Sequence, residues 1–169
     1  MLRSLSLLAA VLSLSGCSKD GDFRKTYSVS GTIAIDGVAA EPGIIVALHP
    51  QYEETDKYPI HPKGETAAGG SFKITTYNTD DGAPEGDYIA TVEWPQRVGM
   101  SPHFGGDLFG GAFGKIDANK SRPEFNVKVT KEGAILKLAL TLTAEQKKGL
   151  EVAKQKAAKQ TSGFNLSGQ

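Results

Sequence analysis

Apolar and polar residues alternate along much of this chain with a period of two residues. The alternation is clear at residues 27–35, 88–94, 125–129 and 136–142. A period of two places every second side chain on one face, as in a strand that buries one side. The pattern therefore predicts half-buried β-strands in each of these stretches, with Tyr88 and Trp94 on a buried face.

Two further stretches extend the set of strands. Residues 44–50 form a short apolar run, and residues 64–77 have the pattern of a hairpin that turns at Gly69-Gly70. Residues 51–64 are charged and carry two prolines, so they are expected to form a loop. About seven short strands with frequent turns predict an all-β sandwich.

The period changes after residue 142. Thr143 and Gln146 have the spacing of a capping box, in which each side chain caps the other residue's backbone N–H. Residues 143–160 are rich in helix-forming residues and predict a short C-terminal α-helix, with residues 161–169 as a disordered tail. Its lysines could contact anionic lipid or an acidic polymer, although a run of charge is usually a solvated face.

The N-terminus has the layout of an export signal. Arg3 precedes an apolar stretch that ends in Leu14-Ser15-Gly16-Cys17. This ending resembles the bacterial lipobox, and the resemblance implies removal of residues 1–16 and attachment of lipid to Cys17. Residues 17–25 then form a polar tether, and residues 26–142 form the sandwich.

Cys17 is the only cysteine of the chain, so no internal disulfide can form. The resemblance also implies acylation of the new amino terminus, by palmitate for example. Several acyl chains give a stable membrane anchor, whereas one chain binds only marginally. We expect an exported protein anchored to the cell membrane, or to an outer membrane, since Ser18 resembles the residues that permit transport there.

Three motifs in the first half of the sandwich resemble a known family. They are "VSGTIAIDGVAAEPGIIVALHP", "TAAGGSFKITTY" and "APEGDYIATVEW". Their order is similar to that of the carboxypeptidase regulatory-like group of transthyretin-like sandwiches. The resemblance implies a seven-stranded transthyretin-like or Ig-like β-sandwich. It also implies a non-enzymatic protein, because most members of the group are not catalytic. Ala67 stands where the group usually has Asp, and the C-terminal helix lies outside the pattern.

The acidic cluster at residues 80–87 is either a cation site or a turn. Calcium needs about six or more converging oxygens, and the spacing typical of calcium loops is absent here. Turns attract Asp and Gly for backbone reasons alone, which favours a turn. In that case Gly86 supplies the turn, and Tyr88 fills the corner while its hydroxyl bonds to the backbone.

Three histidines are the main candidates for chemistry: His49, His61 and His103. None has the local spacing of a metal motif, and each is more simply a solvated side chain. The sequence has no G-x-S-x-G elbow. It also lacks the Tyr-Arg-Gly-Ser motif of hydroxyisourate hydrolase, an enzyme with the transthyretin-like fold. No cofactor is expected. An accessory hydrolase or metal-binding protein using these histidines stays open as an alternative.

Residues 95–123 show no periodicity and are the predicted partner-binding loop. Long aperiodic loops in compact domains are usually functional or disordered, and this one contains aromatic residues, which disordered linkers lack. The candidate contact residues are His103, Phe104, Asp107, Phe109 and Phe113. In the alternative interpretation, Leu108 and the phenylalanines pin the loop to the core.

The overall charge of the chain gives no support to nucleic acid as a partner. The chain has 19 basic and 19 acidic residues, so no global field favours nucleic acid. We therefore expect a lipid-anchored envelope protein that is a non-enzymatic binding or structural module, with an envelope protein or a polysaccharide as partner. A subunit that docks onto a larger envelope complex is the third possibility considered.

Overall fold

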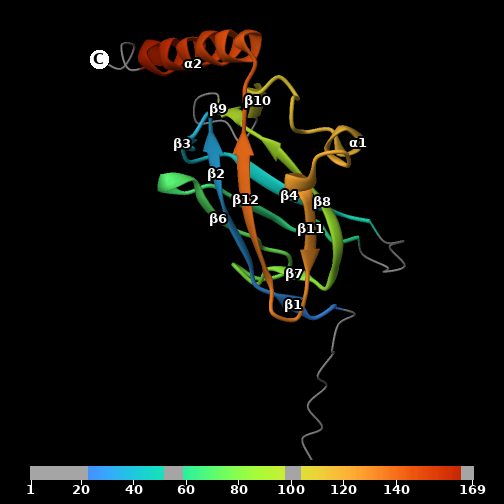
Figure 1. Cartoon of the computed structure of the whole chain (residues 1–169). Coiled ribbons are helices and arrows are strands. Elements are labelled where there is room, and N and C mark those ends of the chain that lie inside the picture. The colour runs from blue at the N-terminus through green and yellow to red at the C-terminus, as the bar shows by residue number, and fades with distance from the viewer. Residues whose placement is uncertain (1–22, 52–58, 98–103, 165–169) are drawn as a thin grey trace, which may run out of the picture.

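The fold is a sandwich of two β-sheets, with a helix across one end (Figure 1). The computed structural model describes residues 23–51, 59–97 and 104–164. The first sheet has the order β11-β8-β4-β5 and is antiparallel throughout. Its strands are β4 (Ile45–Pro50), β5 (Lys63–Glu65), β8 (Gly86–Glu93) and β11 (Asn126–Val129).

The second sheet is built around one central strand. Its members are β2 (Val29–Ile35), β3 (Val38–Ala39), β6 (Ser71–Lys73) and β12 (Ala134–Leu140). Strand β2 pairs in parallel with β12 over its whole length, and its other edge pairs with β3 and β6. Figure 1 shows β2 and β12 side by side in front of β4 and β8. The all-β sandwich is therefore confirmed.

The number of strands differs from the prediction of seven. The described residues contain twelve strand segments. The five additional ones are short. Strand β3 pairs with β2, β1 (Thr26–Tyr27) pairs with β7 (Ala83–Pro84), and β9 (Pro95–Arg97) pairs with β10 (Phe104–Asp107). Pairs of two to four residues carry too few positions to show a period, so the pattern could not reveal them.

The predicted hairpin at residues 64–77 divides between the two sheets. Strand β5 pairs with β4, whereas β6 pairs with β2, and a short 3₁₀ turn, η1 (Ala68–Gly70), links them. The segment that follows β6 returns to β5, because Thr75 forms a bridge with Lys63, and β5 and β6 approach closely beside it. Gly64 permits this approach, because a Cβ there would overlap the carbonyl of Lys73. One side of the sandwich is closed in this way.

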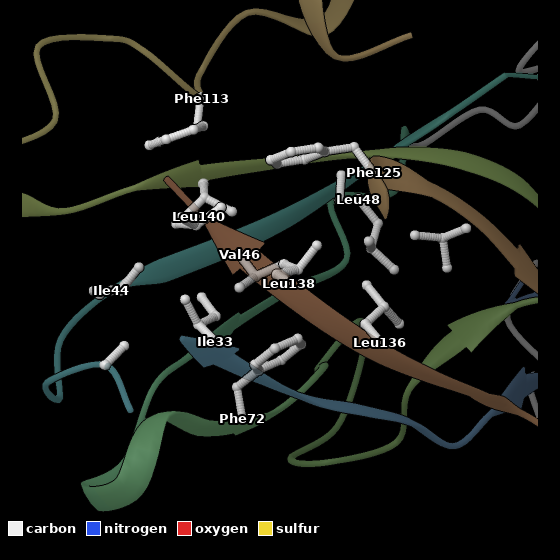
Figure 2. Packing of buried hydrophobic residues seen from close by; sticks show 14 of the residues in the cluster. Ile33, Ile44, Val46, Leu48, Phe72, Phe113, Phe125, Leu136, Leu138 and Leu140 are labelled. Atoms are coloured by element: carbon white, nitrogen blue, oxygen red, sulfur yellow. The ribbon is translucent and has the colours of Figure 1, made fainter. Parts of the chain in front are cut away.

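Alternate residues of the facing strands fill the space between the sheets. Ile33 and Leu138 of the second sheet are 1% exposed, and Val46 and Leu48 of the first sheet are equally buried. Figure 2 shows these side chains meeting, with Phe113 and Phe125 covering the same core at one end. The predicted inward face of β8 is confirmed, since Tyr88 and Trp94 are 1% and 7% exposed.

The C-terminal helix α2 (Ala144–Phe164) lies across the end of the sandwich opposite β1 and β7 (Figure 1). The predicted capping box is present, because Thr143 N–H donates to Gln146 Oε1 at 2.8 Å and Gln146 N–H donates to Thr143 Oγ1 at 3.2 Å. The helix continues to Phe164, so residues 161–164 are not the tail that was predicted. Extending a formed helix adds one hydrogen bond per residue, which lets it run beyond its best formers.

Candidate functional site

The described part of the predicted partner-binding loop, residues 95–97 and 104–123, is structured. Besides β9 and β10, it contains the short helix α1 (Ile116–Asn119) and a 3₁₀ turn, η2 (Pro123–Phe125). The N–H of Leu108 donates to the carbonyl of Trp94 at 2.8 Å, which extends the β9–β10 pairing to the end of β8. The absence of a sequence period reflects short elements rather than absent structure.

Phe109 and Phe113 are core residues. They are 3% and 2% exposed, so neither presents a surface to a partner. Their rings join Trp94 and Phe125 in a row with centroid separations of 5.7, 5.4 and 6.2 Å. The prediction that these two phenylalanines contact a partner is therefore corrected: burying their apolar surface closes the core, as the pinning alternative proposed.

A basic side chain lies over each end of this aromatic row. The Lys154 ammonium is 4.7 Å from the centroid of Trp94, and the Arg122 guanidinium is 5.2 Å from the centroids of both Phe113 and Phe125. Such cation–π contacts are worth roughly 0.5–1 kcal/mol at exposed sites. Lys154 also pairs with Glu41 at 2.6 Å, so one lysine of the basic helix docks α2 onto the sandwich.

Asp107 organises the loop around its carboxylate. Oδ1 accepts hydrogen bonds from the N–H groups of Trp94 and Phe109, at 2.8 and 3.1 Å. Oδ2 accepts one from the N–H of Gly111 at 2.8 Å. Because both oxygens bond to backbone, Asp107 acts as a structural residue of the turn rather than as a partner contact.

Asn119 is a buried polar residue that the sequence did not single out. Its amide donates to the carbonyls of Ala90 and Phe113, at 3.0 and 2.8 Å, and so attaches α1 to β8. Its Oδ1 has no hydrogen-bond partner among the described residues. An Asn in an aperiodic segment resembles any loop residue, so no sequence signal could have identified it.

Three predicted residues lie wholly or partly outside the described structure. Cys17 and His103 fall in ranges that are not described. Phe104 is placed through its backbone, as the first residue of β10. Lipidation of Cys17 and partner contact by His103 and Phe104 therefore remain predictions.

The acidic cluster at residues 80–87 forms a turn. The carboxylate of Asp81 accepts hydrogen bonds from three backbone N–H groups, those of Thr76, Tyr77 and Asn78, at 2.7–3.1 Å. The side chain of Asp80 instead pairs with Lys73 at 3.1 Å. The predicted turn is therefore what the structure contains.

Tyr88 closes the corner beside this turn. Its hydroxyl donates to the carbonyl of Pro84 at 2.8 Å, within a buried setting. Gly82 makes the close packing possible, since its φ of 83° suits glycine and a Cβ would overlap the carbonyl of Tyr27. The tyrosine corner that the sequence predicted is present.

Two of the three histidines lie near one another on the outer face of the first sheet. His49 Nε2 is 2.9 Å from Thr91 Oγ1. Burial lowers the pKa of His49 below 6.5, the nearby His61 lowers it further, and Glu93 opposes both. Thr91 is only 4% exposed, whereas His49 is half-buried. In the described ranges, no three histidine, cysteine or carboxylate side chains gather closely enough to hold a metal ion.

The described surface has a groove of about 860 Å³. It lies against β12, β2 and β6 and extends to β5, where the two sheets meet. Its lining includes hydroxyl side chains, three lysines and two carboxylates. Of these only Asp80, in the acidic cluster, stood out in the sequence. The others alternate with core positions along regular strands, so their pattern resembles any solvated sheet face.

Exposed apolar side chains are scattered over the described surface. Phe23, Val38, Ile135 and Val152 are the large ones, and they belong to separate segments of the chain. Single exposed apolar residues are normal, whereas docking surfaces group them into a patch. Among the described helices, none combines the length and the apolar character needed to cross a bilayer.

Comparisons with known proteins do not assign this chain to a family. No family model matches the chain, and no curated protein does. Among solved structures, it is similar to the dioxygenase domain of a dioxygenase–carbohydrate-binding protein fusion from Streptomyces sp. SirexAA-E, at 17% identity. The similarity covers 68% of this chain and 77% of that one, with a TM-score of 0.33, which is too low to carry an argument about fold or function.

Proposed function

We propose that this chain is a lipid-anchored protein of the bacterial cell envelope whose sandwich is a non-enzymatic binding module. The observation that carries the anchor is the run Leu14–Cys17, in which the only cysteine of the chain ends an apolar export signal. The tether from Cys17 to Lys25 is short, and the sandwich begins directly after it at Thr26.

We further propose that the sandwich is of the transthyretin-like type. The three motifs behind this proposal fall in chain order on strands of the two facing sheets: the first covers β2 and β4, the second β6, and the third β8. The corner at Tyr88 and Pro84 supports the same assignment. In this chain the outer face of the second sheet carries the groove, which is the surface proposed for binding.

The anchor is tested by replacing Cys17 with Ala in the full chain expressed in a bacterium that processes lipoproteins. The wild-type protein is expected to mature to residues 17–169 plus the mass of a diacylglyceryl group and an acyl chain. The variant is expected to lack that lipid mass. Ser28→Ala, at an exposed serine close to the tether, is the control and should mature like wild type. Equal lipid mass in wild type and Cys17→Ala contradicts the proposal.

A further inference from the structure

We propose that the groove on the second sheet binds a carboxylated glycan chain, with hydroxyl side chains contacting the sugar and two lysines contacting its carboxylates. The inference deepens the proposed binding function and rests on it. The groove has a volume of about 860 Å³, within the range of ligand sites in proteins.

Small hydroxyl side chains form the floor of the groove. Thr32 of β2 lies opposite Ser71 of β6, and Ser30 lies two residues earlier on β2. Their hydroxyls make no hydrogen bond to any described residue, so each can donate to a ligand and accept from it. Hydroxyl groups at adjacent strands suit a ligand that carries hydroxyl groups along its own length.

The backbone of the floor is already occupied. Strand β2 pairs with β12 on one edge and with β6 on the other, so the N–H and C=O groups at the floor bond within the sheet. Addition of a peptide strand requires free backbone groups at a sheet edge. At β2 a ligand is therefore recognised by side chains. Strand β12 pairs on one edge only among the described strands, so the peptide probe of the test below decides whether an extended peptide binds there.

Two lysines stand at opposite sides of the floor. Lys137 of β12 lies opposite Thr32, and Lys63 lies on β5 beyond β6. Neither forms an ion pair within the described structure, whereas the third lysine of the groove, Lys73, pairs with Asp80 at 3.1 Å. Unpaired ammonium groups are suited to carboxylates, and lysines outnumber the two carboxylates of the lining.

The separation of these lysines sets the size of the ligand. Lys137 is aligned with Thr32 and Ser71, whereas Lys63 is bridged to Thr75, four residues further along. With strands about 4.8 Å apart and residues about 3.3 Å apart along a strand, the Cα atoms of the two lysines are separated by about 20 Å. A ligand that contacts both lysines is therefore an oligomer with repeated carboxylates. Ile135, which is 80% exposed and lines the same groove, offers an apolar contact for the C–H face of a sugar ring.

The test measures binding of the detergent-solubilised full chain to an oligogalacturonate by calorimetry. A maltooligosaccharide of equal length is the neutral probe, and a polyglutamate peptide of equal charge is the peptide probe. We expect binding to the oligogalacturonate only. The double variant Lys63→Gln/Lys137→Gln should bind about tenfold more weakly, as for the loss of two exposed ion pairs.

The control is the double variant Lys128→Gln/Lys131→Gln, which removes two exposed lysines outside the groove lining and should bind like wild type. Thr32→Val keeps the branched shape, removes one floor hydroxyl and should weaken binding without lowering the melting temperature. No binding of oligogalacturonate, or equal weakening in both lysine doubles, overturns the proposal. Equal binding of polyglutamate means that the groove recognises charge alone and also overturns it.

Failure here and failure of the lipid anchor are separable. Cys17→Ala changes the mass and leaves the groove intact, so it should bind oligogalacturonate like wild type. A chain that is lipidated but does not bind contradicts only the glycan inference. A chain that binds but carries no lipid contradicts only the anchor.

Discussion

Asp81 and Asp107 perform the same structural task in two loops that look different in sequence. Each carboxylate accepts hydrogen bonds from three backbone N–H groups. At Asp81 the donors are Thr76, Tyr77 and Asn78. At Asp107 they are Trp94, Phe109 and Gly111. Asp81 lies in an acidic turn that resembles a cation site. Asp107 lies among glycines and phenylalanines that resemble a binding loop.

The two loops differ in the side chains that they contribute to the hydrophobic core. The loop of Asp81 joins β6 to β7 at the sandwich surface, beside the half-buried Tyr77. The loop of Asp107 carries Phe109 and Phe113 into the core. In both loops a carboxylate accepts hydrogen bonds from backbone N–H groups and so fixes the loop. The first loop contributes one aliphatic side chain, Ile74, to the core, whereas the second contributes two aromatic rings. Composition alone does not distinguish an aromatic loop that binds from one that packs.

Phe113→Ala is the largest expected effect, because it removes a core ring from the second loop. Truncation of a buried Phe costs about 3–5 kcal/mol in the free energy of unfolding. Tyr77→Ala, at a half-buried ring in the first loop, should cost less. Urea denaturation of both variants measures the difference. A cost below about 1 kcal/mol for Phe113→Ala, the level of a surface substitution, would contradict its assignment to the core.

Removal of either aspartate comes next in size. Asp107→Ala and Asp81→Ala each leave three N–H groups without their acceptor, and each should cost about 2–3 kcal/mol, since bonds to charged groups are the stronger ones. Hydrogen exchange should localise each effect: the amides of Phe109 and Gly111 gain exchange in one variant, and those of Tyr77 and Asn78 in the other.

Asparagine substitutions sharpen the same comparison. Both aspartates use both carboxylate oxygens, so Asn keeps one acceptor and replaces the other by a donor. We expect Asp107→Asn and Asp81→Asn to lie between wild type and the Ala variants in stability. If Asn is as stable as Asp at either position, the second oxygen contributes nothing there.

The sequence predicted the parts of the fold that rest on a period or on turn chemistry. Alternation identified β2, β8, β11 and β12, and a short apolar run identified β4. The capping box placed the start of α2. The tyrosine corner was implied by the resemblance of Pro84, Gly86 and Tyr88 to the pattern of the transthyretin-like group. Each of these signals is local, so a single stretch of chain is sufficient to show it.

The parts that were missed depend on contacts between distant residues. The divided hairpin at β5 and β6 depends on which sheet each strand joins, and nothing within residues 64–77 specifies that. Asn119 is structural only because Ala90 and Phe113 present carbonyls to it. The groove likewise exists because Lys137, Thr32 and Ser71 come from three different strands. Spacing along the chain could not reveal these.

Tyr88→Phe gives a smaller effect and tests the corner beside the first loop. The substitution removes only the hydroxyl that donates to Pro84, and leaves that carbonyl without this bond. A neutral hydrogen bond contributes about 1 kcal/mol to stability, so a loss of that size is expected in urea denaturation. Trp94→Phe, which keeps an aromatic ring beside the second loop, is the companion measurement. An unchanged stability of Tyr88→Phe would mean that the ring alone fixes the corner.

The smallest expected effect is a pH dependence at His49, which lies in neither loop. Burial is the main cause that lowers its pKa in the folded protein below 6.5, with His61 adding to the effect and Glu93 opposing it. As pH falls below 6.5, the unfolded chain takes up the proton first, so stability decreases. It levels off once the pH is below the folded-state pKa.

His49→Gln should remove this component of the pH dependence while keeping a polar group near Thr91. As pH is lowered from neutral through 6.5, the unfolding free energy of wild type is therefore expected to decrease relative to that of His49→Gln. His61→Gln is the matched control and should weaken the dependence only in part, because burial of His49 remains. If the difference between wild type and His49→Gln is constant with pH, or shifts in favour of wild type on acidification, then His49 is not held in its neutral form by the fold.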